Sequence, residues 1–358
     1  MSSEYMIWVK TQARTCQYNL ASSGLANYPL ANLPVKLDDL ELTGPSYYGY
    51  EPLQQAIAQK CNVSPDQVFA AIGTSLANHI AMAVLLQPDD EILIEHPTYE
   101  LLISTASYLG ATIKRFNRKF EDGFQTDLRE IERVISPKTR LIVLTNLHNP
   151  SSALTDETTL KHIGEIGRSV GARVLVDEVY LDAAFDLAPR SSIHLGKEFI
   201  VTSSLTKVYG LSGLRCGWVL AEPELIGKMW HLNDLFGNIP AHSAERLSVI
   251  AFDNLETIAK HASLLLKTNH TVIDGFLASY IDLEAKKSNF GTLAFPRLKN
   301  GNSEELCRLL MNKYDTVVVP GKFFEMPGYF RIGFGCKTET LKEGLERLGM
   351  ALQELRTS

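Results

Sequence analysis

The sequence has no stretch that is long and apolar enough to cross a membrane, and it has no basic segment. The longest clean apolar run is IAMAVLL, far short of the roughly 20 residues that a membrane helix needs. The 35 Lys and Arg residues are outnumbered by 41 Asp and Glu residues, which gives a net charge of −6. We therefore expect neither a membrane nor a nucleic acid as a partner.

Cysteine is scarce, and its spacing matches neither a disulfide framework nor a metal site. The five cysteines are odd in number and scattered, and none forms a C-x-x-C pair. This pattern favours reduced thiols and no bound metal. The opening residues MSSEYMIWVK lack the apolar core of a signal peptide. We expect a soluble, cytoplasmic protein.

The chain is long enough for two domains, and strand-like segments alternate with helix-like ones in its middle. Its 358 residues are 45% hydrophobic, which allows a large core. The sequence predicts strands at 67–72, 91–97, 140–146, 173–180 and 199–204, and helices at 75–86, 99–109 and 156–170. This alternation is typical of an α/β fold with a mostly parallel sheet covered by helices.

The pattern changes after about residue 245. The sequence predicts a long helix at roughly 244–275, then short strands, a helix near 303–314 and a final helix at about 337–355. We interpret this part as a smaller α+β domain, on which the proline-broken N-terminus packs. The predicted division is 40–245 for the large domain, and 1–39 with 246–358 for the small domain.

A single lysine and a single arginine occupy the apolar, glycine-rich segment SSLTKVYGLSGLRCGW at 203–218. Lys207 follows a predicted strand, and ligands of open α/β sheets bind beyond the carboxyl ends of strands. Burial favours a neutral lysine amine, which can form an imine with an aldehyde. Arg215 stays charged when buried and suits a phosphate. An aldehyde and a phosphate in one ligand describe pyridoxal 5'-phosphate (PLP); two surface charges are the alternative.

Polar residues near two other strand ends fit the same ligand. Asp177 follows an apolar strand, where a carboxylate needs a cation such as a pyridinium nitrogen. Tyr180 could then reach the phenolic oxygen of the ring, and Asn149 in NLHNPSS could donate to it. A helix N-cap for Asp177 and an Asn-Pro turn are the alternatives.

Three further segments offer binding groups. In AIGTSLANH, Gly73, Thr74 and Ser75 stand where a strand meets a helix, and free backbone N–H groups there bind phosphate. Tyr99 in EHPTYE could stack on a ring or belong to the core. Arg331 in FRIGFG could bind a substrate carboxylate or form a structural salt bridge.

Together these segments resemble the class I/II aminotransferases, PLP-dependent enzymes of fold type I. The matching motifs are G-T-S at 73–75, P-T-Y at 97–99, N-P at 149–150, D-E-V-Y at 177–180, S-L-T-K-x-x-G-L-x-G-L-R-x-G-W at 204–218 and R-I-G-F-G at 331–335. The lysine–arginine segment is the most specific, and the motifs span most of the chain.

The resemblance implies a role for each of these residues. Lys207 would form the imine and shuttle protons, Asp177 would bind the pyridine nitrogen, and Tyr180 and Asn149 would bind the phenolic oxygen. The phosphate would be held by a set of small and basic residues, namely Gly73, Thr74, Ser75, Ser204 and Arg215. Tyr99 would stack on the ring, while Arg331, Asn149 and Gly24 would contact the substrate.

The resemblance also implies a seven-stranded sheet in the large domain and a homodimer with sites at the subunit interface. In such dimers a tyrosine reaches the partner's phosphate, and Tyr48 or Tyr47, next to Gly49, is the candidate here. Where the family often has N-P-x-G, this chain has NPSS, so the turn can differ.

The expected reaction is transamination of an L-amino acid with a 2-oxo acid, by a ping-pong mechanism through an internal aldimine. A PLP-dependent lyase, decarboxylase or cyclase is the alternative, because the bond that breaks depends on the orientation of the substrate. A non-catalytic module that binds PLP or an amino acid is a third hypothesis. The substrate side chain stays open: Arg14, Arg190 and Arg297 could each bind an acidic group or be surface charges.

Overall fold

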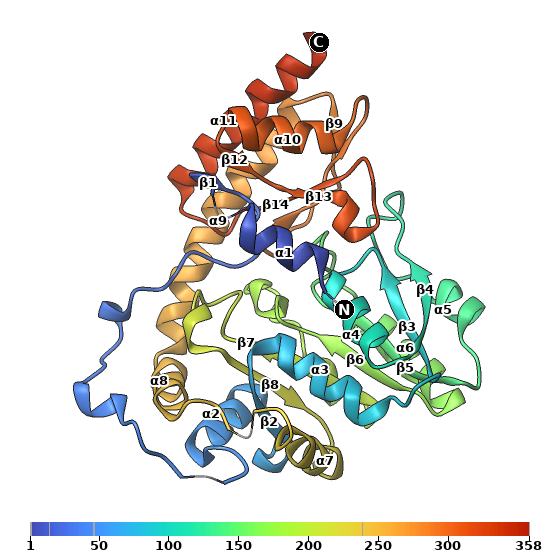
Figure 1. Cartoon of the computed structure of the whole chain (residues 1–358), viewed down its shortest axis with the longest axis vertical. Coiled ribbons are helices and arrows are strands. Elements are labelled where there is room, and N and C mark those ends of the chain that lie inside the picture. The colour runs from blue at the N-terminus through green and yellow to red at the C-terminus, as the bar shows by residue number, and fades with distance from the viewer. Residues whose placement is uncertain (1, 14, 46, 238, 358) are drawn as a thin grey trace.

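A seven-stranded sheet lies at the centre of the larger part of the molecule, as the computed structural model shows (Figure 1). The structure describes residues 2–13, 15–45, 47–237 and 239–357. The strands are β2 (Val68–Ile72), β3 (Glu91–His96), β4 (Thr112–Asn117), β5 (Thr139–Thr145), β6 (Arg173–Asp177), β7 (Phe199–Ser204) and β8 (Cys216–Leu220). Their order is β2-β8-β7-β6-β5-β3-β4, and only the pairs of β8 are antiparallel. The predicted α/β fold with a mostly parallel sheet is confirmed.

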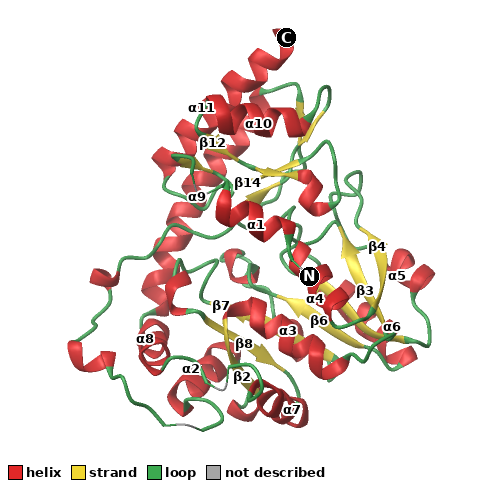
Figure 2. Cartoon of the chain, in the orientation of Figure 1, coloured by secondary structure: helices red, strands yellow, loops and turns green. Residues whose placement is uncertain are grey.

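Helices cover both faces of this sheet (Figure 2). They are α2 (Glu51–Cys61), α3 (Gly73–Leu85), α4 (Glu100–Tyr108), α5 (Leu128–Val134), α6 (Glu157–Val170), α7 (Pro223–Asn233) and α8 (His242–Asp253). Val174 and Val176 of β6 pack in the cluster that α5 and α6 cover, and Leu175 packs in the cluster that contains α3. Because side chains alternate along a strand, Asp177 lies on the α3 face.

The two ends of the chain meet outside the sheet. The elements there are α1 (Glu4–Thr11), β1 (Tyr18–Asn19), α9 (Leu255–Ser279), β9 (Leu283–Glu284), β10 (Leu293–Ala294), β11 (Arg297–Leu298), α10 (Ser303–Lys313), β12 (Thr316–Val317), β13 (Val319–Pro320), β14 (Phe330–Gly333) and α11 (Thr338–Thr357). β1 pairs in parallel with β12, so the N-terminal segment joins the C-terminal part. α1 then lies between that part and the sheet (Figure 1).

Some predicted elements differ from the structure. The helical stretch predicted at roughly 244–275 is helical but divided in two, because α8 ends at Asp253 and α9 begins at Leu255. Asn254 separates them, and its side-chain amide donates to the carbonyl of Ile250 at 2.8 Å. The strand predicted at 173–180 ends at Asp177, whose carboxylate accepts from the backbone N–H of Val179. β4 and β8 were not predicted from the residue pattern.

Two features that the sequence lacks can be checked against the structure. Across the described ranges, every helix is too short or too polar to span a bilayer. All five cysteines are free.

Candidate active site

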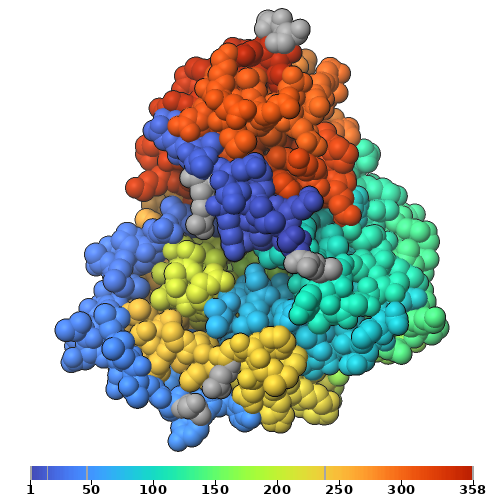
Figure 3. Space-filling view, viewed as in Figure 1, coloured from blue at the N-terminus to red at the C-terminus, as the bar shows by residue number. Residues whose placement is uncertain are grey.

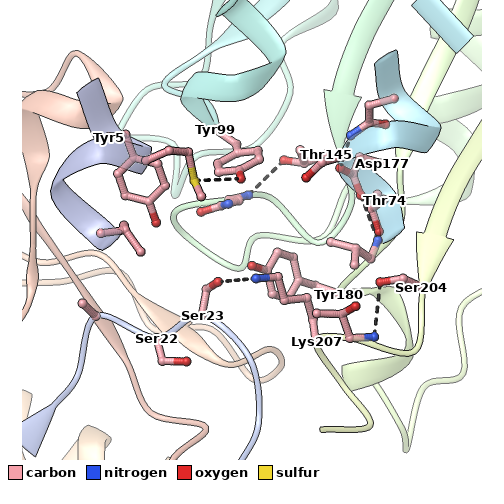
Figure 4. A pocket seen from close by; sticks show the side chains of 18 of the residues that line it. Tyr5, Ser22, Ser23, Thr74, Tyr99, Thr145, Asp177, Tyr180, Ser204 and Lys207 are labelled. Carbon is pink, nitrogen blue, oxygen red and sulfur yellow. Dashed lines mark hydrogen bonds between the residues drawn. The ribbon is translucent and has the colours of Figure 1, made fainter. Parts of the chain in front are cut away.

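A cavity of about 240 Å³ lies at the carboxyl edge of the sheet, beneath α1 (Figure 4). It is lined by most of the residues that the sequence singled out, namely Thr74, Ser75, Tyr99, Asn149, Asp177, Tyr180, Ser204, Lys207 and Arg215. They come from the ends of four strands and from the start of α3 and α4. The structure therefore gathers segments that lie far apart in the sequence into one site.

Asp177 is held at the bottom of this cavity by neutral hydrogen-bond donors. Its Oδ2 accepts from the amide of Asn78 on α3 at 2.8 Å, and its Oδ1 accepts from the N–H of Val179 at 3.1 Å. Asn78 is itself fixed by the hydroxyl of Thr202, which donates to its Oδ1 at 2.6 Å. Burial raises the pKa of the Asp177 carboxyl to about 6, against the lowering effect of these donors. The carboxylate is thus mostly ionised at neutral pH.

Lys207 projects into the cavity, and no acidic side chain of the described residues pairs with its amine. Its Nζ donates to the Oγ of Ser23 at 2.8 Å (Figure 4). Burial lowers the pKa of this amine to about 8. The positive charges of Arg331 and Arg215 act in the same direction, and the carboxylate of Asp177 opposes them. Part of the Lys207 amine is therefore neutral near pH 7.5, the form that can act as a nucleophile or base.

The start of α3 and the loop after β7 form the part of the cavity that offers donors to an anion. The buried hydroxyls of Thr74 and Thr206 have no hydrogen-bond partner among the described residues. Gly73 has φ +76°, and a Cβ there would lie 2.2 Å from a guanidinium nitrogen of Arg215. A side chain at this position would displace the arginine, so glycine lets the guanidinium lie against the backbone.

Arg331 is completely buried behind the cavity wall and binds three neutral acceptors. Its Nη1 donates to the Oδ1 of Asn149 at 3.0 Å, and its Nη2 donates to the hydroxyl of Tyr5 at 3.1 Å and the carbonyl of Ala21 at 3.0 Å. Its Nε has no hydrogen-bond partner in the described part of the chain. Among the described residues no acidic side chain pairs with Arg331, so the alternative of a structural salt bridge is not seen there.

The N-terminal segment contacts the side chain of Lys207 through a serine, while the predicted Gly24 contacts only its backbone. Gly24 packs on the backbone at Lys207, where a Cβ would lie 3.3 Å from the carbonyl oxygen. The neighbouring N–H of Leu25 donates to the same carbonyl at 2.7 Å. Ser23 is the residue whose side chain enters the site, and it is also hydrogen-bonded to Tyr180.

The NPSS turn takes a backbone shape that glycine adopts easily. Ser152 has φ +60°, in the left-handed region that disfavours side chains. Its hydroxyl donates to the carbonyl of Leu293 at 2.9 Å, and its own carbonyl accepts from the hydroxyl of Ser288. These bonds hold the turn without a glycine.

Tyr48 does not line the cavity of the described chain. Its hydroxyl donates to the carboxylate of Asp234 at 3.1 Å, and it is 53% exposed. Tyr47, the other candidate, is 75% exposed. Both tyrosines lie on the surface of this chain.

Several residues that line the site were not singled out from the sequence, among them Tyr5, Ser23, Asn78 and Thr206. Thr206 and Asn78 stood inside motifs already chosen, and the helical spacing from Gly73 could have placed Asn78 toward the strands. Ser23 stood next to Gly24, in the segment chosen for closing over the substrate. Tyr5 had no signal, because its contacts are made with residues distant in the sequence.

The fold and this cavity define the class of PLP-dependent α/β proteins of fold type I. Residues 38–348 match the sequence model of the family described as "Aminotransferase class I and II". The chain belongs to this family. Its cofactor is accordingly PLP.

Known proteins with similar sequences carry different activities in their names. The chain is 28% identical to "Capreomycidine synthase" of Streptomyces vinaceus, over 96% of this chain and 92% of that protein. It is 26% identical to an aspartate aminotransferase of Sulfolobus acidocaldarius, over 87% of this chain and 83% of that protein. The crystal structure of a PLP-dependent aminotransferase from Streptococcus suis matches with a TM-score of 0.93 and 26% identity, covering 99% of this chain and 98% of that one.

Three features of this cavity fit the phosphate, the aldehyde and the pyridine nitrogen of PLP. The two unpartnered hydroxyls and Arg215 supply donors at the phosphate end. The amine of Lys207 has a lowered pKa, as covalent capture of an aldehyde requires. Asp177 offers an ionised carboxylate fixed by Asn78, as a pyridinium nitrogen requires.

Proposed function

We propose that the protein transfers the amino group of an L-amino acid to a 2-oxo acid, in a ping-pong sequence. In this sequence the first 2-oxo acid leaves before the second one enters. The observation that carries the proposal is the placement of the Lys207 amine, with its pKa lowered to about 8, in one cavity with an ionised Asp177 and near a buried Arg331.

PLP, when bound, would supply an aldehyde that captures amines and a ring that draws electrons from the substrate's α-carbon. Lys207 would act as the base that takes the α-proton on its Nζ and later returns it. This role needs the neutral amine, whose fraction rises as the pH passes 8. Ser23, which accepts from Nζ at 2.8 Å, would orient the amine.

Asp177 would keep the pyridine nitrogen protonated, because an anion in a buried place favours a cation beside it. Asn78 and the N–H of Val179 fix the direction of its carboxylate. Tyr180 and Asn149 would donate to the phenolic oxygen, and Tyr99 would stack on the ring.

The ends of the ligands would be held by the remaining groups. Ser75, Ser204 and Thr206 join Thr74 and Arg215 in the phosphate cradle, and Gly73 lets the arginine approach. Arg331 would bind the α-carboxylate of the substrate, with Asn149 and the Gly24 segment beside it. A buried guanidinium with neutral partners suits a carboxylate as its counter-ion.

A second candidate is a cyclisation or elimination on the same cofactor. The similarity to "Capreomycidine synthase", over 96% of this chain, favours keeping it. The same base and the same ring serve both reactions, because they share removal of the α-proton. They differ in where the amino nitrogen of the substrate goes. Transamination moves it to a second 2-oxo acid, whereas elimination releases it as ammonia and cyclisation keeps it in the product.

The two candidates separate when the amino nitrogen is followed. The PLP-loaded protein is incubated with ¹⁵N-labelled amino acids, with and without 2-oxoglutarate or pyruvate, and products are read by mass spectrometry. Transamination puts ¹⁵N into glutamate or alanine, and only when the acceptor is present. Consumption without an acceptor, with free ammonia or a cyclised product, contradicts transamination and favours the second candidate.

We further propose that the chain works as a cytoplasmic homodimer with two domains per subunit, 40–245 and 1–39 with 246–358. The pairing of β1 with β12 supports the joined small domain, and the free cysteines support a reducing compartment. The exposed Tyr48 is then free to reach the cofactor phosphate of a partner. Light scattering of the PLP-loaded protein tests the dimer, and a monomer would contradict it.

A further inference from the structure

The helix α1 forms one wall of the cavity, which no motif in the sequence indicated. Tyr5, Met6 and Val9 line the cavity, whereas Ile7 is 52% exposed on the other side of the helix. The space-filling view shows α1, in dark blue, across the front of the molecule between the C-terminal part and the sheet (Figure 3). A substrate in the cavity would therefore be close to this helix.

Tyr5 attaches α1 to both sides of the cavity. Its ring packs edge-on against Tyr99 at 5.9 Å and lies 5.5 Å from Phe323. Its hydroxyl accepts from the Nη2 of Arg331 at 3.1 Å. Met6 adds a contact of its sulfur with the hydroxyl of Tyr99 at 3.9 Å (Figure 4). The helix is thus fixed by the ring and the arginine that would meet the substrate.

Arg331 carries a buried charge with no negative partner in the described part of the chain. Its acceptors are the amide of Asn149, the hydroxyl of Tyr5 and the carbonyl of Ala21. These three bonds fix the plane of the guanidinium but leave the charge uncompensated. Tyr5 therefore orients the arginine toward an incoming anion.

The wall that α1 supplies carries no charge. The charged residues that line the cavity, within the described ranges, are Lys207, Arg215 and Asp177, and each has a role toward the cofactor. Of the arginines left open by the sequence, Arg297 pairs with Glu284 at 2.9 Å, and Arg190 lies 3.8 Å from Glu157, both away from this cavity. Arg14 lies outside the described residues.

We propose that α1 selects the substrate, and this rests on the proposed function. Tyr5 is a positioning residue that orients Arg331 for the α-carboxylate, whatever the side chain. Met6 and Val9 receive a side chain that is uncharged and mainly apolar. A charged side chain of either sign would be buried against this wall without a counter-ion, which is costly.

The first test measures binding by the change in visible absorbance of the PLP-loaded protein, with no 2-oxo acid present. We expect leucine, methionine and phenylalanine to bind at least about tenfold more tightly than aspartate, glutamate, lysine or arginine. Tightest binding of a charged amino acid overturns the proposal while the proposed function stands. A spectrum that no amino acid changes removes the proposed function, and this inference with it.

The second test compares two lysines on the same helix. Met6→Lys should weaken binding of apolar amino acids by at least about tenfold and favour aspartate and glutamate, because it places a cation on the wall. Ile7→Lys, on the exposed side of α1, is the matched control and should change these affinities less than about twofold. Equal effects of both variants, at unchanged thermal stability, would overturn the proposal.

The third test isolates the hydroxyl of Tyr5. Tyr5→Phe keeps the ring packing and removes the hydrogen bond that the hydroxyl accepts from the charged guanidinium of Arg331. Binding of every amino acid should weaken by about tenfold, by the same factor for apolar and charged side chains. An unchanged dissociation constant, or a loss confined to one kind of side chain, would overturn the positioning role.

Discussion

Two buried groups of charges in this molecule are built in opposite ways. Glu95 and Arg118 form an ion pair at 2.8 Å, with both side chains fully buried. The carboxylate of Glu95 also accepts from the N–H and the hydroxyl of Thr145, at 2.7 and 2.6 Å. Arg118 also donates to the carbonyl of Phe124 at 2.6 Å. Each charge of this pair therefore has an opposite charge and further hydrogen-bond partners within the protein.

The charges of the cavity are left incomplete. Lys207 donates to a serine hydroxyl rather than to an acid, and Asp177 accepts from an amide rather than from a cation. Arg331 binds three neutral groups, and the hydroxyl of Thr74 has no partner among the described residues. These groups are buried or half-buried without partners of opposite charge, so ligands would lower their free energy.

The difference separates a structural polar cluster from a functional one. A satisfied buried pair stabilises the fold only modestly, but removal of one partner is costly. An unsatisfied group reduces stability and is retained where it serves binding or chemistry. Variants in the two regions should therefore have opposite profiles of stability and activity.

The largest effect is expected for Lys207→Ala. Loss of the amine removes both covalent attachment of PLP and the proton-transfer base, so turnover should fall by about 10⁴-fold or more. Borohydride treatment of the PLP-loaded protein should label Lys207 in the wild type and leave no label at this position in the variant. A variant with wild-type turnover would refute the role of Lys207.

The next largest effect is expected when one partner of the Glu95–Arg118 ion pair is removed. Glu95→Ala should destabilise the cofactor-free protein by about 3–5 kcal/mol, because Arg118 would remain buried without its carboxylate. Urea unfolding of the variant and the wild type measures the difference. A loss below about 1 kcal/mol would show that this pair is not the structural cluster described above.

Asp177→Asn should instead stabilise the cofactor-free protein. Because the carboxyl pKa is raised from its ordinary value of 3.8 to about 6, ionising it in the folded protein costs stability at neutral pH. At 1.36 kcal/mol per pK unit, the cofactor-free variant should gain up to about 3 kcal/mol at pH 7. The gain should shrink as the pH falls through 6 and vanish below about 3.8.

Urea unfolding of the cofactor-free proteins at pH 7 and pH 4 measures this gain. Turnover of the PLP-loaded variant should fall even though its fold is more stable. A variant that is less stable than the wild type at pH 7 would contradict the view that Asp177 is strained.

The smallest effect is expected for Ser23→Ala. The hydroxyl accepts one hydrogen bond from the amine of Lys207, and a typical hydrogen bond contributes about 0.5–1.5 kcal/mol. Turnover should fall by about tenfold or less, and PLP should still attach covalently. Ser22→Ala, the neighbouring change in the same cavity, is the control. Equal losses in both variants would contradict a specific role for Ser23.

Much of the sheet and about half of the residues that line the cavity could be predicted, because their signals are local. Strands such as β5 and β7 are short apolar runs, and Lys207, Asp177 and Thr74 stand where these runs end. β4 is an edge strand of mixed polarity, TIKRFN, so its pattern is weak. β8 follows a glycine-rich loop that hides its start.

The rest depends on contacts that no local pattern encodes. Ser23 meets Lys207 across 184 residues, and Tyr5 meets Arg331 across 326 residues. Such pairs arise only when the N-terminal segment crosses from the C-terminal part to the sheet.

Lys207 is a half-buried amine whose pKa is lowered to about 8 by its surroundings. The direct measurement is its rate of reductive alkylation by formaldehyde and cyanoborohydride in the cofactor-free protein, followed by peptide mass spectrometry from pH 6 to 11. Lys197, whose side chain is 88% exposed, is the internal reference for the reagent. The account predicts a midpoint near pH 8 for Lys207, shifted lower in Asp177→Asn, where the opposing negative charge is gone. A midpoint at the ordinary lysine value of about 10.4, unchanged in that variant, would contradict it.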